Sequence, residues 1–421
     1  MAIVGESAGS KLVEAPMNPA ETRNPPRPTS YWRIAAACGI VMAGFLAIAG
    51  SYALSLQGIN PTASDFIGYW VAGQQLVRHA NPYDLQAVLQ LEKSVGYDGA
   101  EPRLTPSPPV GLLLLLPLGK LSVKAGLFVW TMTQFAALAL SLTVLWLLHG
   151  SPPTRLHLFG FVFAPAIACL QAGQLGVFLL LSVVLFLYFI RTNPFLAGAV
   201  LLPCMLKPHL FVLFFLALIL WAGFNQAYRV LEGAASIAAA SSALTLFFDP
   251  AIWTHYVAMT RSATLQDRYT PTLGVAFRLM VAWNAEWPRF VPLAIGCGWA
   301  FWYFWTRRDH WDWMDQGLLV LLVSVLCSPY AWFTDESVLL PAVLTAAMCA
   351  RQNNRSPLPI ALAAGVALAE LASGVKITTW FFLWTSPAWL ACYLYGTRLK
   401  KSGTQPELPQ TSSPARVTGN L

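Results

Sequence analysis

The sequence predicts an all-α polytopic membrane protein, from its composition and from its long uncharged segments. Of the 421 residues, 56% are hydrophobic and 11% are charged, whereas soluble domains carry about 25% charged residues. Runs such as Phe128 to Leu148 and Leu175 to Ile190 contain no Asp, Glu, Lys or Arg. These runs approach the roughly 20 apolar residues that cross a bilayer as a helix. An ordinary soluble enzyme is therefore excluded.

The two ends of the chain are polar and predict disordered cytoplasmic tails over residues 1–33 and 398–421. The first tail is rich in Pro, and no small-residue cleavage site follows the first apolar segment. Because a signal peptide needs such a site and a short charged start, we expect no cleaved leader. Residues 34–397 form one predicted transmembrane domain.

Apolar segments bounded by Pro, Gly or basic residues divide this domain into about twelve predicted spans. Several are shorter than a typical transmembrane helix, and their boundaries are approximate. The predicted spans are 34–56, 125–148, 156–171, 175–190, 195–206, 208–223, 230–248, 290–306, 316–333, 337–350, 358–374 and 379–397.

Basic residues between the spans indicate the orientation of the chain. Short cytoplasmic loops of membrane proteins are enriched in Lys and Arg. With a cytoplasmic N-terminus, the C-terminus is cytoplasmic too. The same side then receives the loops that carry Arg155, Arg191, Arg229, Arg307 and Arg308, Arg351 and Arg355, and Arg398, Lys400 and Lys401.

This orientation depends on the apolar run Ser107 to Gly119. The run is bounded by Pro and is shorter than the roughly 20 residues of a span. If it crossed the membrane, every later loop would change sides. We therefore predict a re-entrant segment, which enters the outer leaflet and returns.

The predicted outer face collects the most polar and aromatic segments outside the tails. It includes a large first extracytoplasmic loop, residues 57–124, and a second one, residues 249–289. The Gly173-Gln174 turn and the stretch Ser328 to Glu336 face the same side. Because the inner loops are short, we expect the chemistry to face the periplasm or the exterior. The sequence thus predicts a multi-pass protein of the inner (plasma) membrane.

Several classes of ligand are not expected. The net charge of +7 comes from scattered Lys and Arg residues rather than from a basic stripe, so it does not indicate nucleic acid binding. The seven cysteines include no Cys-x-x-Cys pair. The chain also lacks a Gly-x-Gly-x-x-Gly, P-loop or Asp-x-Asp motif for a nucleotide and its metal. We therefore expect neither a metal site nor a cofactor.

Motifs along the chain resemble, in order, those of a known enzyme family. They are "DFIGYWVAGQQLVRHANPYD" from Asp65, "PSPPVGLLLLLPLGKL" from Pro106, "QAGQLGVFLLL" from Gln171, "AGAVLLPCMLKPHLFVLFF" from Ala197 and "SPYAWF" from Ser328. From about residue 34 to residue 395, the chain is similar to glycosyltransferase family 87. Members of this family use polyprenyl-phosphate-linked sugars and have the GT-C architecture. The resemblance implies a GT-C-like helical bundle.

Asp65 follows the first predicted span and precedes aromatic residues at spacings that suggest a short amphipathic helix. One interpretation is that its carboxylate caps this helix by accepting backbone N–H bonds. The resemblance implies another, because family members hold an Asp in the first extracytoplasmic loop as general base. Asp65 matches that residue by position and by its Asp-Phe-x-x-Tyr-Trp context. Tyr69 in the same motif is a candidate for contact with sugar or acceptor.

Lys207 separates two apolar segments in the sequence "LKPHL". Assisted by His209, a lysine there can neutralise the phosphate of a lipid-linked leaving group. Alternatively, Lys207 extends toward lipid headgroups. Arg261 and Arg268 in the second outer loop are further candidates for phosphate binding, although charged loop residues are often only solvated.

Polar and aromatic side chains at two outer turns are candidates for contact with the sugar or acceptor. The Gln174 amide can hydrogen-bond a sugar hydroxyl, unless its turn only connects helices. Tyr330 and Trp332 can stack on a sugar ring beside Asp335, although Tyr and Trp also gather at membrane interfaces. Family members often have a basic or His-containing pattern after this Trp, whereas "FTDE" follows here. This departure leaves the sugar and the acceptor open.

Together these features imply an integral-membrane glycosyltransferase. It would transfer a sugar, with mannose favoured, from a polyprenyl-phosphate donor to an extracytoplasmic glycan or glycolipid. The reaction would invert the anomeric carbon in one displacement, with Asp65 as base. Its partners would be these two substrates and membrane lipids. The alternatives are a transporter or flippase of lipid-linked sugars, against which the lack of an internal repeat argues, and a non-catalytic scaffold.

Overall fold

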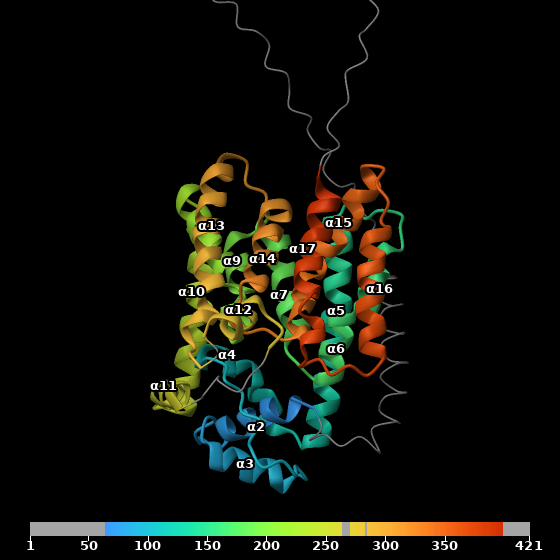
Figure 1. Cartoon of the computed structure of the whole chain (residues 1–421). Coiled ribbons are helices and arrows are strands. Elements are labelled where there is room, and N and C mark those ends of the chain that lie inside the picture. The colour runs from blue at the N-terminus through green and yellow to red at the C-terminus, as the bar shows by residue number, and fades with distance from the viewer. Residues whose placement is uncertain (1–63, 263–269, 283, 399–421) are drawn as a thin grey trace, which may run out of the picture. The chain divides into compact units, whose positions relative to one another are not determined.

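The computed structural model describes residues 64–262, 270–282 and 284–398, all within one compact unit over residues 47–421. Within these ranges the protein is helical and contains no β-strand (Figure 1). The prediction of an all-α protein is therefore confirmed for the described residues. The predicted N-terminal tail and first span lie outside them, as does the C-terminal tail after Arg398.

Helices follow one another closely along the chain. The α-helices are α2 (Phe66–Val77), α3 (Leu85–Ser94), α4 (Pro109–Leu112), α5 (Val123–Leu148), α6 (Ala164–Ala172), α7 (Gly176–Phe189), α8 (Pro194–Ala199), α9 (Val212–Phe224), α10 (Arg229–Phe248), α11 (Ile252–Ser262), α12 (Leu273–Val281), α13 (Val291–Arg307), α14 (Leu318–Leu326), α15 (Leu340–Gln352), α16 (Leu358–Ala372) and α17 (Thr385–Thr397). The shorter 3-10 and π segments are η3 (Leu113–Lys120), η4 (Leu156–Val162), η5 (Leu202–Leu206), η6 (Pro208–Leu210), η7 (Trp287–Phe290), η8 (Arg308–His310), η9 (Trp313–Gly317), η10 (Phe333–Leu339) and η11 (Trp380–Phe382).

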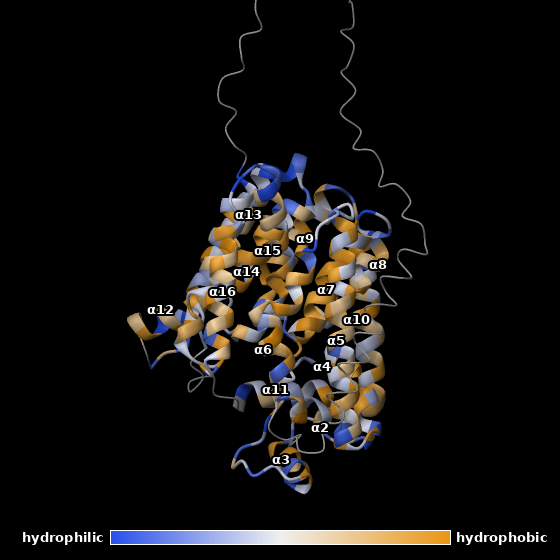
Figure 2. Cartoon of the chain, turned by 90° about the vertical axis from the view of Figure 1, so that its right-hand side faces the viewer, coloured by the Kyte–Doolittle hydropathy of each residue, from blue (hydrophilic) through white to orange (hydrophobic). Residues whose placement is uncertain are grey.

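Three helical segments are each long and apolar enough to cross a membrane. They are α5, α10 and the continuous run Phe333–Gln352, which η10 and α15 form together. Shorter apolar helices accompany them, and Figure 2 shows hydrophobic residues along the middle of the bundle. The chain is thus a helical membrane protein. The total of about twelve spans stays a prediction.

Several predicted spans are interrupted by segments that are not α-helical. The span 195–206 is divided between α8 and η5, and Lys207 follows η5 directly. The span 316–333 is longer than the helix observed, because α14 ends at Leu326 and residues 328–332 are irregular. The breaks matter because residues in them can turn toward the interior of the bundle.

Arg side chains join the loops at one end of the bundle. Arg191, before α8, forms an ion pair with Asp312, before α14, at 2.9 Å. Arg351, at the end of α15, donates a hydrogen bond to Thr154 Oγ1 at 3.2 Å. Where the structure describes them, the loops that the distribution of basic residues assigns to the cytoplasm lie at this same end of the bundle (Figure 1). Which side of the membrane they occupy stays a prediction.

The opposite end of the bundle holds α2, α3, α4 and α11 (Figure 1). There α2 packs closely on η3, since a Cβ atom added at Gly119 would lie 2.0 Å from the Gly73 carbonyl oxygen. The predicted re-entrant run 107–119 corresponds to α4 and η3, which are too short to cross a bilayer. Its entry into the outer leaflet stays a prediction. The glycine contact fixes α2, which begins immediately after Asp65.

A buried carboxylate holds η10 against α17. Glu336 is 2% exposed. It accepts hydrogen bonds from Thr385 Oγ1 at 2.7 Å, from Ser386 Oγ at 2.8 Å and from Trp389 Nε1 at 2.9 Å. Because η10 also carries Asp335, these contacts fix a segment that supports the cavity described below.

Replacing Glu336 with alanine is expected to destabilise the protein by about 3 kcal/mol, because the buried donors Ser386 Oγ and Trp389 Nε1 lose their acceptor. Thr385 Oγ1 can still donate to the Phe382 carbonyl oxygen. Thermal unfolding of the purified protein in detergent measures this as a lowered melting temperature. Glu232→Ala is the matched control, since the Glu232 side chain is 55% exposed and only faces Arg229 at 3.8 Å. Equal melting temperatures for the two variants would contradict the role of Glu336.

Candidate active site

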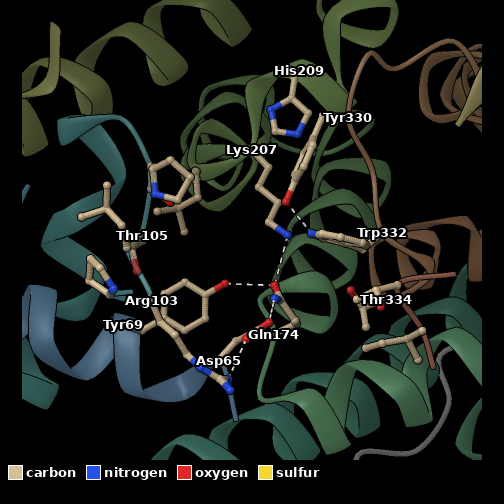
Figure 3. A pocket seen from close by; sticks show the side chains of 17 residues that line it. Asp65, Tyr69, Arg103, Thr105, Gln174, Lys207, His209, Tyr330, Trp332 and Thr334 are labelled. Atoms are coloured by element: carbon tan, nitrogen blue, oxygen red, sulfur yellow. Dashed lines mark hydrogen bonds and ion pairs between the residues drawn. The ribbon is translucent and has the colours of Figure 1, made fainter. Parts of the chain in front are cut away.

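A cavity of about 340 Å³ lies beside α2, at the breaks in the apolar helices (Figure 3). Its volume is within the usual range for small-molecule sites, about 300–1,000 Å³. Side chains from distant parts of the sequence line it, including residues that the sequence motifs single out. Those residues are Asp65, Tyr69, Gln174, Lys207, His209, Tyr330 and Trp332.

Asp65 faces this cavity rather than capping α2. Its backbone N–H donates to the Ala172 carbonyl oxygen at 2.9 Å, which ties the start of α2 to the end of α6. Its carboxylate accepts from Arg103 Nη1 at 3.1 Å and from Gln174 Nε2, and it makes no capping hydrogen bond. The capping interpretation is therefore wrong. With its side chain 45% exposed, Asp65 is accessible to a ligand that enters from water.

Arg103 is a cavity residue that the sequence analysis did not single out. It is the only Lys or Arg between Lys93 and Lys120, and this is the one sequence feature that could have identified it. The Arg103 backbone N–H donates to the Glu92 carboxylate at 3.1 Å. A Cβ atom added at Gly68 would lie 2.2 Å from the Arg103 carbonyl oxygen. The absence of that atom lets α2 lie directly against the segment that holds Arg103.

Gln174 projects into the cavity from the turn after α6. Gly173 ends that helix with φ of +68°, a left-handed conformation that glycine adopts without steric cost. The Gln174 Oε1 accepts from Tyr69 Oη at 3.0 Å and from Lys207 Nζ at 3.2 Å. Burial, and after it the negative charge of Asp65, raises the pKa of the Tyr69 phenol well above its ordinary value. The Tyr69 hydroxyl therefore stays protonated and donates a hydrogen bond to the amide oxygen.

Lys207 points into the protein and not toward lipid headgroups. Its side chain is 12% exposed, and its Nζ donates to Asp335 Oδ1 at 2.6 Å. Burial lowers the pKa of Lys207, but the charge and hydrogen bond of Asp335 outweigh burial, and the net direction is upward. Lys207 is therefore a cation at neutral pH. The alternative that it extends to the membrane surface is wrong.

An aromatic wall stands next to Lys207. The rings of His209 and Tyr330 meet at 5.6 Å between centroids, edge to face. Trp332 Nε1 donates a hydrogen bond to Tyr330 Oη, and the Trp332 backbone N–H donates to Asp335 Oδ2 at 3.0 Å. Among the described residues, His209 Nε2 has no hydrogen-bond partner. The wall thus offers aromatic faces to a ligand, whereas the His209 Nε2 atom is itself buried.

Two of the predicted site residues that the structure describes do not line the cavity, and a third cannot be placed. Asp335 is fully buried behind it, where it pairs with Lys207 and Trp332. Arg261 is exposed in the last turn of α11 and does not reach the cavity. Arg268 lies outside the described residues.

A comparison with protein families shows the class of this protein. The family model of glycosyltransferase family 87 matches residues 107–329, more than half of the 421 residues. The chain belongs to glycosyltransferase family 87. No curated protein and no solved structure matches it.

Family 87 membership makes this protein a membrane glycosyltransferase. The matched region contains Gln174 and Lys207, whereas Asp65 and Trp332 lie outside it. The cavity nevertheless brings these residues together, with one amide bridging a carboxylate and an ammonium group. The candidate site therefore combines a solvent-accessible carboxylate with a fixed positive charge.

Proposed function

We propose that this protein transfers a sugar from a polyprenyl-monophosphate donor to the hydroxyl group of an extracytoplasmic glycan or glycolipid. The observation that carries the proposal is the meeting of Asp65 and Lys207 in one cavity, where both contact Gln174. Glycosyl transfer from a phosphate needs a base at the nucleophile and a positive charge at the leaving group. The cavity offers both.

Asp65 acts as the general base in this proposal. The acceptor hydroxyl gives its proton to the carboxylate while the acceptor oxygen attacks the anomeric carbon. The bond between that carbon and the phosphate oxygen breaks with its electron pair on the phosphate, and the configuration inverts. The half-exposed carboxylate suits this role, because an acceptor arriving from water can come within hydrogen-bond distance of it.

Lys207 stabilises the departing polyprenyl phosphate, assisted by His209. Its ammonium group is held by Asp335 and Gln174, so little reorganisation is needed when charge develops on the phosphate. Asp335, a candidate from its sequence for contact with the sugar or acceptor, is better suited to fixing Lys207 because it is fully buried.

The sugar ring packs against Tyr330 and Trp332 in this proposal, and Tyr69 borders the acceptor. Mannose remains the favoured sugar from the family resemblance. The cavity end of the bundle faces the periplasm or the exterior of an inner (plasma) membrane, because the basic loops lie at the other end. Arg261 and Arg268 remain candidates for contact with the donor phosphate, although Arg261 on α11 does not line the cavity.

A donor screen with the purified protein in lipid vesicles tests the proposal. Polyprenyl-phosphate mannose, glucose and arabinose are each supplied with glycolipid acceptors, and a nucleotide-linked sugar serves as control. We expect transfer from a polyprenyl-phosphate sugar, with release of polyprenyl phosphate, and none from the nucleotide-linked sugar. Movement of the labelled lipid between leaflets without transfer would instead favour a flippase.

A further inference from the structure

A chain of contacts with alternating charge passes through Gln174, and Figure 3 shows its part from Lys207 to Arg103. Asp335 contacts Lys207 at 2.6 Å, and Lys207 contacts Gln174 Oε1 at 3.2 Å. Gln174 Nε2 donates to Asp65, which contacts Arg103 at 3.1 Å. Gln174 is the neutral member that joins the cation to the base.

The two ends of the Gln174 amide cannot exchange places. The Lys207 ammonium group only donates hydrogen bonds, so it requires the amide oxygen. The ionised Asp65 carboxylate only accepts, so it requires the amide nitrogen. A rotated amide would point its N–H donors at the ammonium donors and its oxygen at the carboxylate oxygens, so neither hydrogen bond could form. The neighbours on both sides therefore select one orientation.

The backbone at Gln174 is held as firmly as its side chain. The Gln174 carbonyl oxygen accepts from Gln134 Nε2 at 2.6 Å, and the Gly173 carbonyl oxygen accepts from Trp130 Nε1 at 2.9 Å. The Gln174 N–H donates to the Cys169 carbonyl oxygen at 3.0 Å. Both Gln134 and Trp130 are buried. Such a turn fixes the amide between its two charged partners.

Little of the Gln174 amide is left for a sugar. Its oxygen has two lone pairs, and Tyr69 and Lys207 occupy both. Its nitrogen has two N–H groups, and one is bound to Asp65. Only one N–H remains for a ligand.

We propose that Gln174 is a positioning residue rather than a residue that recognises the sugar. It holds the carboxylate of the base Asp65 at a fixed position relative to the ammonium group of Lys207. This inference rests on the proposed function. The amide orients the Asp65 carboxylate toward the acceptor by one hydrogen bond and orients the Lys207 ammonium toward the leaving phosphate by another. Displacement of reacting groups by about 1 Å lowers rates by about 100-fold.

Gln174→Glu tests this role, because it keeps the size of the side chain and its acceptors toward Tyr69 and Lys207. It replaces the donor to Asp65 with an oxygen and sets two carboxylates side by side. We expect kcat to fall about 100-fold with little change in the KM for the donor. Since the second carboxylate disfavours the ionised base, the acidic limb of the pH–rate profile moves to higher pH. A raised KM with an unmoved limb would overturn the inference.

Gln134→Leu is the matched control. It removes a buried Gln that supports the same turn without touching Asp65 or Lys207. It lowers the melting temperature but leaves the acidic limb in place. If the limb moves equally in both variants, Gln174 has only a structural role.

Two further measurements keep the inference open to refutation. If Gln174→Glu does not fold, Gln174→Asn decides, because the shorter amide cannot reach both charged partners and should lower kcat similarly. Wild-type turnover by the Gln174→Asn variant would overturn this inference but leave the proposed function standing. Absence of transfer by the wild-type protein from every polyprenyl-phosphate sugar would overturn the proposed function and this inference with it.

Discussion

Asp65→Asn is expected to lower sugar transfer by about 10²- to 10⁴-fold, the range that a general base contributes. Asparagine has the shape of aspartate and still offers an oxygen to Arg103, but it cannot take the proton of the acceptor hydroxyl. The loss should appear in kcat, with the KM for the donor nearly unchanged. Single-turnover transfer in vesicles with a labelled lipid-linked sugar measures it.

The folded structure should survive this change. The Asp65–Arg103 ion pair is partly exposed on both sides, at 45% and 33%. Partly exposed pairs of this kind contribute about 0–1 kcal/mol to stability. A melting temperature within a few degrees of wild type would therefore accompany the loss of transfer.

Asp84→Asn is the matched control for Asp65→Asn. Asp84 is also an acid at the start of a helix in the first predicted outer loop, where it accepts from the backbone N–H groups of Gln86 and Ala87. Asn caps helices about as well as Asp, so this variant should keep both fold and transfer. Full transfer by Asp65→Asn would remove Asp65 from the mechanism.

Hydropathy predicts much of the fold because a membrane helix must pair its own backbone groups. Uncharged runs such as that of α5 therefore mark helices directly. Hydropathy does not locate the breaks well. The predicted span 316–333 joins α14 to the irregular residues 328–332, because the latter are also apolar and aromatic. These breaks place Trp332 and Lys207 in the cavity.

The site is predictable only in part, because its contacts join residues far apart in sequence. Asp65 and Lys207 were singled out by the family motifs, whereas no local pattern pairs Lys207 with Asp335, 128 positions away. Arg103 lies in no quoted motif, and its only distinction in the sequence is that no other Lys or Arg lies between Lys93 and Lys120. Arg261 looked equivalent in sequence, but α11 holds it away from the cavity. Charge alone therefore overpredicts phosphate-binding residues.

Lys207→Met is expected to abolish transfer and also to destabilise the protein. It removes the cation that faces the leaving phosphate, and it leaves the Asp335 carboxylate buried without its partner. Breaking a buried ion pair on one side costs about 3–5 kcal/mol. The melting temperature in detergent should fall clearly below that of wild type. A loss of transfer in this variant alone would therefore not separate chemistry from folding.

The double variant Lys207→Met with Asp335→Asn separates the two effects. The double variant has no buried carboxylate without a partner. Its melting temperature should therefore regain most of what the single Lys207→Met variant loses. Transfer should stay at least about 100-fold below wild type, because no positive charge stabilises the phosphate as the glycosyl bond breaks. Recovery of both stability and transfer would show that the ion pair only supports the fold. Recovery of stability alone would assign Lys207 to the leaving group, since the two variants then differ in folding but share the same chemical defect.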